Sequence, residues 1–273
     1  MSDNNGSPAT IRFTNGGAYE RYMGIWSQAA GHTFLDWLSP AAGLQWLDVG
    51  CGNGAFTDLI LSRCAPFSVD GLDPSAEQLE FARARFASHA SAGGAGIPIA
   101  FRQGDAQALP YDDDAFDVAV MPLVIFFLQD PAKGVAEMKR VVRAGGLVTA
   151  YAWDMPGQGF PYAVINRELK KMEVKLPQAP SPEISEIGAL RDLWIAGGLK
   201  DVEVREIIVQ RTYRDFEDYW EIIQGAPSAS AILGAFSAEQ REHLRANLRR
   251  ELPAPAQGPF TLTARAHAVR GTV

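Results

Sequence analysis

The sequence predicts an α/β fold, a Rossmann-like sheet with mostly parallel strands, and three observations support this. Short apolar runs alternate with helical segments between residues 44 and 153, as in βαβ units, whose strands run parallel. The runs are continuously apolar, which is typical of strands covered by helices on both faces. A glycine-rich turn also follows the first run, in the position where such folds place a nucleotide over a helix N-terminus.

The expected elements follow from these runs and from local stop signals. We expect strands at residues 44–49, 67–72, 97–102, 116–121, 147–153, 202–210 and 260–269. We expect helices at residues 19–38, 55–65, 75–89, 131–142, 162–174 and 186–196, and largely helical structure within 211–258. Ser75 is a suitable N-cap for its helix. Gly145 and Gly146 are expected to end the helix at 131–142.

The domain organisation is predicted to be a flexible N-terminus, residues 1–17, followed by a single domain, residues 18–273. Two stretches, 154–185 and 211–258, are much longer than the usual connection of about 4–6 residues. Long insertions at one edge of a sheet commonly cover a ligand. We therefore expect residues 18–40, 154–185 and 211–258 to form a helical cap.

The composition indicates which kinds of partner the chain is expected to bind. Its net charge of −7 argues against a nucleic-acid partner, which usually requires a basic surface. The longest apolar run, Val118–Leu128, is shorter than the roughly 20 residues needed to span a bilayer, so we expect no membrane association. Two cysteines form neither a disulfide framework nor a zinc site. We expect no metal and a cytoplasmic location; oligomeric state is not readable from the sequence.

The first strand and its turn, residues 47–54, have the sequence LDVGCGNG. Glycines allow positive φ and a close approach of the backbone to a ligand. Asp48 lies before the glycines, where a carboxylate would repel a pyrophosphate but attract an ammonium or a sulfonium. The alternative is that Asp48 is a solvated carboxylate at a strand end.

Two further acidic positions follow the next strands. Asp73 ends the second strand, about 20 residues after the loop, where a carboxylate can accept both ribose hydroxyls; its alternative is a cap for the following helix. Gly104-Asp105-Ala106 follows the third strand. There a carboxylate can accept a hydrogen bond from the adenine amino group, and the Ala106 amide can donate to a ring nitrogen.

Together these motifs, with Leu109-Pro110-Tyr111 and Phe116-Asp117, resemble class I S-adenosylmethionine-dependent methyltransferases. Within that family the chain resembles the branch of quinone-biosynthesis C-methyltransferases and their small-molecule relatives. The resemblance is strongest from Tyr19 to about Trp153 and weaker beyond. It implies a seven-stranded sheet of order 3-2-1-4-5-7-6 with an antiparallel last strand, and S-adenosyl-L-methionine as the cofactor.

The resemblance also implies roles for individual residues. Glycines would wrap the methionine moiety above Asp48, acids would hold the ribose and adenine, and flanking side chains would pack against the adenine. The implied residues are Gly50, Gly52, Gly54, Asp48, Asp73, Asp105, Ala106, Pro74, Gln78 and Met121. Tyr22 and Trp26 are equally compatible with closing over the cofactor and with packing of an amphipathic helix.

The chain departs from many relatives after the fourth strand. They place a histidine there, suited to proton removal, whereas this chain has Leu123-Val124-Ile125-Phe126-Phe127. Phe126 cannot act as a base, so we expect an apolar acceptor site and identify no catalytic residue. Among the four histidines, His32 is the best candidate for a site role, although a packed or exposed histidine is the commoner case. We expect no catalytic role for His267.

The predicted function is transfer of a methyl group, by in-line displacement, to a small apolar or aromatic acceptor. The alternatives are a nicotinamide-dependent oxidoreductase, a non-catalytic S-adenosylmethionine-binding module and a methyltransferase acting on a macromolecule. Ala55 fits the oxidoreductase fingerprint, but Asp48 and Gly104-Asp105-Ala106 speak against it. The sequence does not reveal the acceptor or the atom that is methylated.

Overall fold

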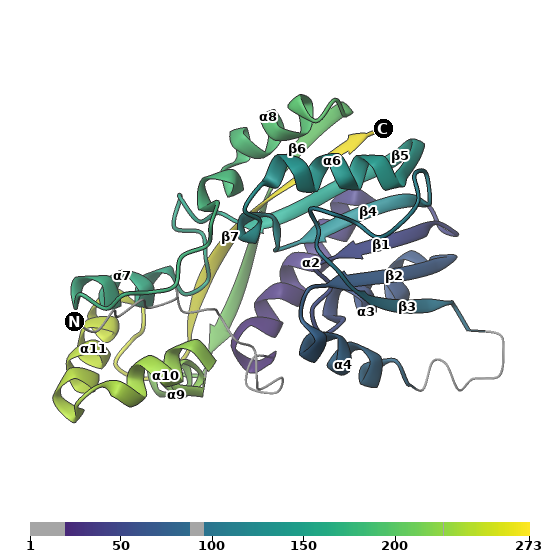
Figure 1. Ribbon diagram of the computed structural model, residues 1–273. Helices are drawn as coiled ribbons and strands as arrows, with labels where there is room; N and C mark the ends of the chain where they lie inside the picture. Colours follow the sequence, from purple (N-terminus) through teal and green to yellow (C-terminus); the bar gives the residue numbers. More distant parts are fainter. Residues whose placement is uncertain (1–19, 88–95, 226) are drawn as a thin grey trace, which may run out of the picture. The chain divides into compact units, whose positions relative to one another are not determined.

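A seven-stranded sheet in the order β3-β2-β1-β4-β5-β7-β6 forms the centre of the fold (Figure 1). The computed structural model describes residues 20–87, 96–225 and 227–273. β1 pairs in parallel with β2 and β4, whereas β7 runs antiparallel to β5. The strands are β1 Gln45–Val49, β2 Ser68–Asp73, β3 Ile99–Gln103, β4 Phe116–Pro122, β5 Val142–Trp153, β6 Lys200–Tyr213 and β7 Phe260–Thr272. The predicted fold class and strand order are confirmed.

The helices alternate with the parallel strands as predicted, and further helices follow β5 and β6. The α-helices are α2 Ile25–Leu38, α3 Ala55–Cys64, α4 Ala76–Arg85, α6 Pro131–Val141, α7 Ala163–Lys171, α8 Ile187–Ala196, α9 Phe216–Gly225, α10 Pro227–Ala235 and α11 Ala238–Glu251. The short turns are η1 Glu20–Gly24, η2 Ile125–Phe127 and η3 Pro182–Ser185. Ser75 caps α4 as predicted, because its hydroxyl accepts a hydrogen bond from the Gln78 amide at 3.2 Å.

Two predicted helix boundaries differ in the structure. The first helix begins as a π-helical turn, Glu20–Gly24, before α2. The glycine pair does not end α6: the helix ends at Val141, and Gly145 and Gly146 lie inside β5. Val142 already pairs with Phe116 there, before a shift in register, so pairing between strands overrides the local glycine signal. The end predicted for the helix at 75–89 and the flexible N-terminus, 1–17, lie outside the described residues.

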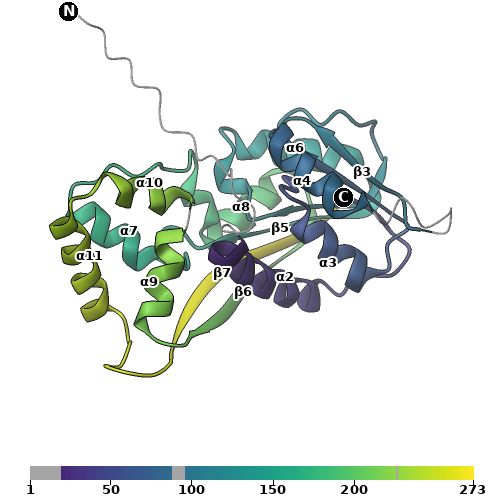
Figure 2. The ribbon, with the colours of Figure 1, turned by 90° about the horizontal axis from the view of Figure 1, so that it is seen from below.

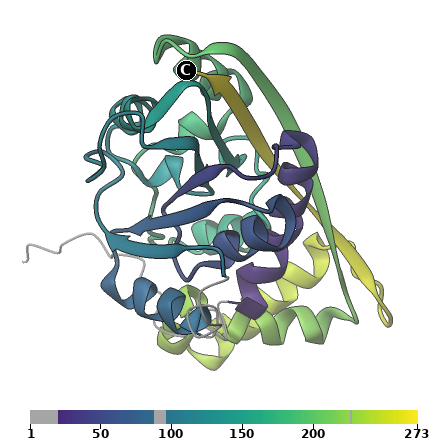
Figure 3. The same cartoon turned by 90° about the vertical axis from the view of Figure 1, so that its right-hand side faces the viewer.

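β6 and β7 extend several residues beyond their predicted ends, and Figure 3 shows these two long strands, green and yellow, side by side. They are neighbours in the sheet. Side-chain contacts between Gln210 and Thr263, and between Thr212 and Thr261, continue along the pair. Partners distant in sequence therefore determine the length of these strands.

The chain divides into two compact units, which we call the larger and the smaller unit. The larger unit comprises Met23–Pro161, Pro180–Arg211 and Leu262–Val273. In it, α2 and α3 lie on one face of the sheet and α6 and α8 on the other (Figures 1 and 2). Trp194 of α8 is fully buried, and its indole N–H donates to the Val148 carbonyl of β5 at 3.0 Å. This unit contains every strand end at which the sequence predicts a site.

The smaller unit comprises the described N-terminal residues up to Tyr22, together with Tyr162–Ala179 and Thr212–Thr261. An aromatic cluster forms its interior: Tyr219 is fully buried and lies 5.1 Å from the Tyr213 ring and 6.0 Å from the Phe260 ring, between centroids. The predicted cap stretches 154–185 and 211–258 supply most of this unit, whereas α2 belongs to the larger unit. That the unit acts as a cap stays a prediction.

Among the residues that the structure describes, no helix combines the length and the apolar character that crossing a membrane requires.

Candidate functional site

The glycine-rich loop lies at the carboxyl ends of β1 and β2. The amides of Gly50 and Cys51 both donate to the carbonyl of Leu72 in β2, at 2.7 and 3.0 Å. This contact ties the loop to the end of β2, so the loop is a fixed feature of the sheet edge. The α3 helix begins at Ala55, immediately after the loop, so its N-terminal amides point toward the same edge.

Two glycines of this loop adopt backbone conformations that side chains disfavour. Gly50 has φ of +77°, and a Cβ there would lie 2.5 Å from Val124. Gly52 has φ of +53°, but the nearest atom to a Cβ there is Gln78 Oε1 at 3.8 Å. The loop is thus packed tightly below Gly50 and leaves space beside Gly52, which suits close approach of a ligand to the backbone.

Asp48 is fully buried at the end of β1. Its Oδ2 accepts a hydrogen bond from the Thr57 hydroxyl at 2.7 Å. Its Oδ1 is buried, and no hydrogen-bonding group of the described chain reaches it. Burial raises the pKa of Asp48 to about 7, and the Asp73 carboxylate adds to this, against the lowering effects of the Thr57 hydroxyl and the Thr57 backbone. A cationic group beside Oδ1 would supply the missing partner.

Asp73 connects the loop to the next helix. Its Oδ2 accepts from the Gly52 amide at 2.9 Å, and its Oδ1 accepts from the Ser75 amide at 2.8 Å. Burial raises the pKa of Asp73, opposed by these two amide contacts. The N-cap of α4 is Ser75, so Asp73 does not cap the helix itself but holds the amide of the residue that does. A carboxylate oxygen holds two lone pairs, so these contacts leave capacity for hydroxyl donors.

Asp105 and Ala106 follow β3 in a turn. The Asp105 carboxylate is exposed and accepts from the Gln107 amide at 2.8 Å. Ala106 is buried at 7% exposure. The acid is thus oriented by its own turn and accessible from solvent. Recognition of adenine by this pair stays a prediction.

The three residues predicted to flank adenine occupy different environments. Pro74 is exposed, and its carbonyl accepts from the Gln103 side chain at 2.8 Å. Gln78 lies on α4 with its Oε1 facing the open side of Gly52. Met121 is fully buried in β4, and its Cε lies 3.8 Å from where a Cβ of Gly134 in α6 would be. Gln78 is therefore the one that the structure places beside the loop.

Tyr22 and Trp26 are both buried, but they belong to different units. The Tyr22 ring stacks on Tyr162 at 3.9 Å between centroids, and its carbonyl accepts from the Tyr162 hydroxyl at 2.6 Å. Trp26 is 0% exposed in α2, and its indole N–H has no hydrogen-bond partner among the described residues. The packing interpretation describes these contacts of Tyr22, and a role toward the cofactor stays a prediction for both.

His32, Tyr151 of β5 and Phe126 have different surroundings. His32 is exposed on α2, where the Arg63 guanidinium donates to its carbonyl and lies 3.1 Å from its Nδ1, so its choice as the best histidine finds no structural support. Tyr151 is buried against Phe34 and Phe56, which is a core position. Phe126 is buried in η2, directly after β4.

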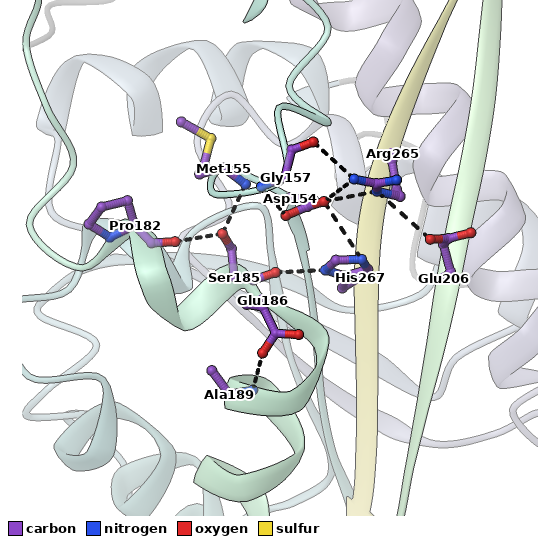
Figure 4. Close-up of polar contacts among 10 residues, drawn as sticks. All are labelled: Asp154, Met155, Gly157, Pro182, Ser185, Glu186, Ala189, Glu206, Arg265 and His267. Carbon is purple, nitrogen blue, oxygen red and sulfur yellow. Dashed lines mark hydrogen bonds and ion pairs between the residues drawn. The ribbon is translucent and has the colours of Figure 1, made fainter.

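A second buried acid lies directly after β5 and was not singled out in the sequence (Figure 4). Asp154 is 3% exposed, and its Oδ2 accepts from Arg265 Nε and Nη2 at 2.8 and 2.6 Å. Its Oδ1 accepts from the Gly157 amide at 2.8 Å. Asp154 and Arg265 are 111 positions apart, so no local sequence motif predicts this ion pair.

Ser185, His267 and Asp154 lie together in this cluster without the geometry of a hydrolytic triad (Figure 4). His267 Nδ1 contacts the carbonyl of Ser185, not its hydroxyl, at 2.8 Å. The Ser185 hydroxyl donates to the Pro182 carbonyl at 2.6 Å and accepts from the Met155 amide at 3.1 Å. A nucleophile must instead share its proton with the histidine. We therefore interpret the cluster as a clamp that anchors the segment after β5.

Known proteins resemble this chain mainly over the half that carries the loop. Residues 47–150 match the model of the methyltransferase domain family. An uncharacterised methyltransferase of Mycobacterium bovis is 33% identical over 130 residues, which cover 48% of this chain and 46% of that protein. A chloroplastic 2-methyl-6-phytyl-1,4-hydroquinone methyltransferase of Oryza sativa is 39% identical over 104 residues, which cover 38% of this chain and 28% of that protein. The chain spans less than half the length of these two relatives.

Solved structures share the fold over most of the chain. Phosphoethanolamine N-methyltransferase 2 of Haemonchus contortus, solved in complex with S-adenosyl-L-methionine, superposes with a TM-score of 0.58 at 17% identity. The match covers 94% of this chain and 56% of that one. The family match shows that residues 47–150 form a methyltransferase domain, and the strand order is the one predicted for class I S-adenosylmethionine-dependent methyltransferases. The predicted family is confirmed.

The residues present fit this cofactor. The buried Asp48 Oδ1 lacks a partner, and the cofactor carries an ammonium and a sulfonium. The space beside Gly52 and the remaining acceptor capacity of Asp73 suit a ligand that lies along the sheet edge. The exposed Asp105 suits the far end of such a ligand.

Proposed function

We propose that this protein transfers a methyl group from S-adenosyl-L-methionine to a small, largely apolar or aromatic acceptor. The observation that carries the proposal is the buried Asp48 oxygen without a hydrogen-bond partner in the described chain, directly below the glycine loop. Unsatisfied buried acceptors are rare in native proteins and require an explanation. A cationic ligand provides one, and a pyrophosphate does not.

The cofactor supplies an activated methyl group on a positively charged sulfur. In this proposal Asp48 holds the charged amino-acid end, and Asp73 accepts hydrogen bonds from the ribose hydroxyls. Asp105 and Ala106 read the adenine, and Gln78, on the open side of Gly52, packs against it. Because the sulfonium is already a strong donor, the protein mainly aligns the acceptor and excludes water.

The apolar acceptor is argued from Phe126. This buried side chain occupies the segment where many relatives have a histidine, so a base at that position is absent. An apolar wall favours an acceptor that is already nucleophilic, such as a phenolate, an enolate or a neutral amine. The cap role of segments 154–185 and 211–258 is part of the same proposal.

The test is a transfer assay with the full chain and S-adenosylmethionine carrying a labelled methyl group. The acceptors are a panel of phenols, quinols and aromatic amines, with total RNA and a protein mixture as comparison arms. We expect label in the aromatic panel. Robust labelling of RNA or protein, with none in the panel, would contradict the proposed acceptor class.

A further inference from the structure

Thr57 makes a buried contact that the cofactor role of Asp48 does not by itself explain. Thr57 lies near the start of α3, is fully buried and donates its hydroxyl hydrogen to Asp48 Oδ2 at 2.7 Å. Oδ1 of the same carboxyl has no partner among the described residues. One oxygen is therefore fixed, and the other is left for a ligand.

The charges around Asp48 do not favour its ionised form. The charged side chain that acts on it is another carboxylate, Asp73 of β2, which raises its pKa. Cys51 of the loop is buried as well, and burial together with these two carboxylates holds the pKa of its thiol well above the usual range. The Arg83 guanidinium of α4 acts on Cys51 only as the smallest of several influences. Burial and the neighbouring Asp73 carboxylate therefore both favour the protonated form of Asp48.

We propose that Thr57 is a positioning residue of the cofactor site, and that cofactor binding drives release of a proton from Asp48 to solvent. This inference rests on the proposed function. Below about pH 7, the Asp48 carboxyl carries a proton before binding. The ammonium of the ligand then pairs with the carboxylate, so the O–H bond of Asp48 breaks and its proton passes to water. The hydroxyl of Thr57 holds the second oxygen throughout.

The direction of the pH dependence follows from the burial of the acid. Burial raises the pKa of Asp48 to about 7. Below that pH, binding must include the free-energy cost of deprotonating Asp48, and well above it this cost disappears. Affinity should rise about tenfold per pH unit below pH 7 and then level off. The Thr57 hydroxyl lowers the pKa of Asp48. Thr57→Val, which removes it, should shift the rise to higher pH.

The experiment is calorimetric titration of the full chain with S-adenosylhomocysteine, which keeps the amino-acid ammonium. Titrations at about pH 5.5, 6.5 and 7.5, each in two buffers of different ionisation enthalpy, measure the protons released on binding. We expect nearly one proton released at the lowest pH and fewer at the highest. Thr57→Val should release more at the highest pH than wild type. Thr57→Ser, which keeps the hydroxyl, is the matched control and should behave as wild type.

The outcomes separate this inference from the proposed function. Binding with the same affinity at every pH, and no proton release in wild type, overturns the coupling and leaves the cofactor assignment intact. No binding at any pH overturns the proposed function itself. Identical proton release in wild type and Thr57→Val overturns the role of Thr57. The wild-type titration needs no variant, so poor folding of Thr57→Val leaves the coupling testable.

Discussion

Two buried carboxylates, Asp48 and Asp154, have opposite relations to their surroundings. Asp154 accepts two hydrogen bonds from Arg265 and one from the Gly157 amide. Asp48 accepts from Thr57 on one oxygen only, and its other oxygen has no partner in the described chain. A fully satisfied buried acid specifies local structure, whereas a partly satisfied one points to a ligand. The difference distinguishes the clamp from the site.

The largest effect is expected from breaking the clamp. Arg265→Ala leaves Asp154 buried without its cation, and loss of one partner from a buried ion pair costs about 3–5 kcal/mol. Because the Arg265 side chain is 39% exposed, we expect a loss of about 2–4 kcal/mol in the free energy of unfolding. Denaturant unfolding measures it, with Arg265→Lys as the milder control. An unchanged midpoint would show that the cluster anchors nothing.

Asp48→Asn should produce the opposite pattern, a more stable protein that binds cofactor poorly. Burial raises the pKa of Asp48 to about 7. The contribution of this group to the free energy of unfolding is therefore at its maximum below about pH 4 and is lost as the pH rises through 7. The neutral amide should therefore raise the free energy of unfolding by about 1–3 kcal/mol at pH 8 and change it little at pH 4. Urea unfolding at the two pH values measures this.

The same variant should weaken S-adenosylhomocysteine binding by at least about tenfold, through loss of the charge pair. Thr57→Ser serves as a control for disturbance of the pocket. If Asp48→Asn is destabilised at pH 8, or binds as wild type does, the comparison between the two acids fails.

Asp73→Ala should weaken cofactor binding by about 1–3 kcal/mol, because it removes charge-assisted hydrogen bonds to hydroxyls. The variant also frees the amides of Gly52 and Ser75, so some loss of stability should accompany it. Asp73→Asn retains acceptor oxygen for one of them and separates the two effects. Calorimetry and thermal unfolding on both variants provide the data. Unchanged affinity in folded Asp73→Ala would contradict the ribose assignment.

The smallest effect is expected at Asp105. Its carboxylate is exposed and contacts its own turn, so Asp105→Ala should change the free energy of unfolding by no more than about 0.5 kcal/mol. Affinity for S-adenosylhomocysteine should fall by about 0.5–1.5 kcal/mol, the usual worth of one hydrogen bond. Normal binding of adenosine compounds by this variant would rule out the adenine role.

The sequence predicts the strand order and the loop well because both are encoded locally. Continuous apolar runs mark the parallel strands, and Ser75 announces the start of α4. The ends of β6 and β7 were predicted too short, since pairing partners far along the chain decide them. The end of α6 was misplaced for the same reason, because Val142 already pairs with Phe116.

The site was predictable as a set of residue types but not as a set of contacts. Asp48, Asp73 and Asp105 lie at or just after strand ends, and the alternation of apolar runs with helical segments predicts where those strands end. That Thr57 satisfies one oxygen of Asp48 and nothing described satisfies the other depends on how α3 packs over β1. The pairing of Asp154 with Arg265 depends on the antiparallel placement of β7 beside β5. Contacts between segments that are distant in the sequence cannot be predicted from a local sequence pattern.

The central claim is that the buried Asp48 oxygen belongs to an S-adenosylmethionine site. Calorimetric titration of the wild-type chain with S-adenosylhomocysteine and, separately, with NAD tests it most directly, with Asp48→Asn titrated in parallel. We predict one S-adenosylhomocysteine bound per chain, no heat of binding with NAD, and weakened binding in the variant. Binding of NAD, or equal binding of S-adenosylhomocysteine by wild type and Asp48→Asn, would contradict the claim.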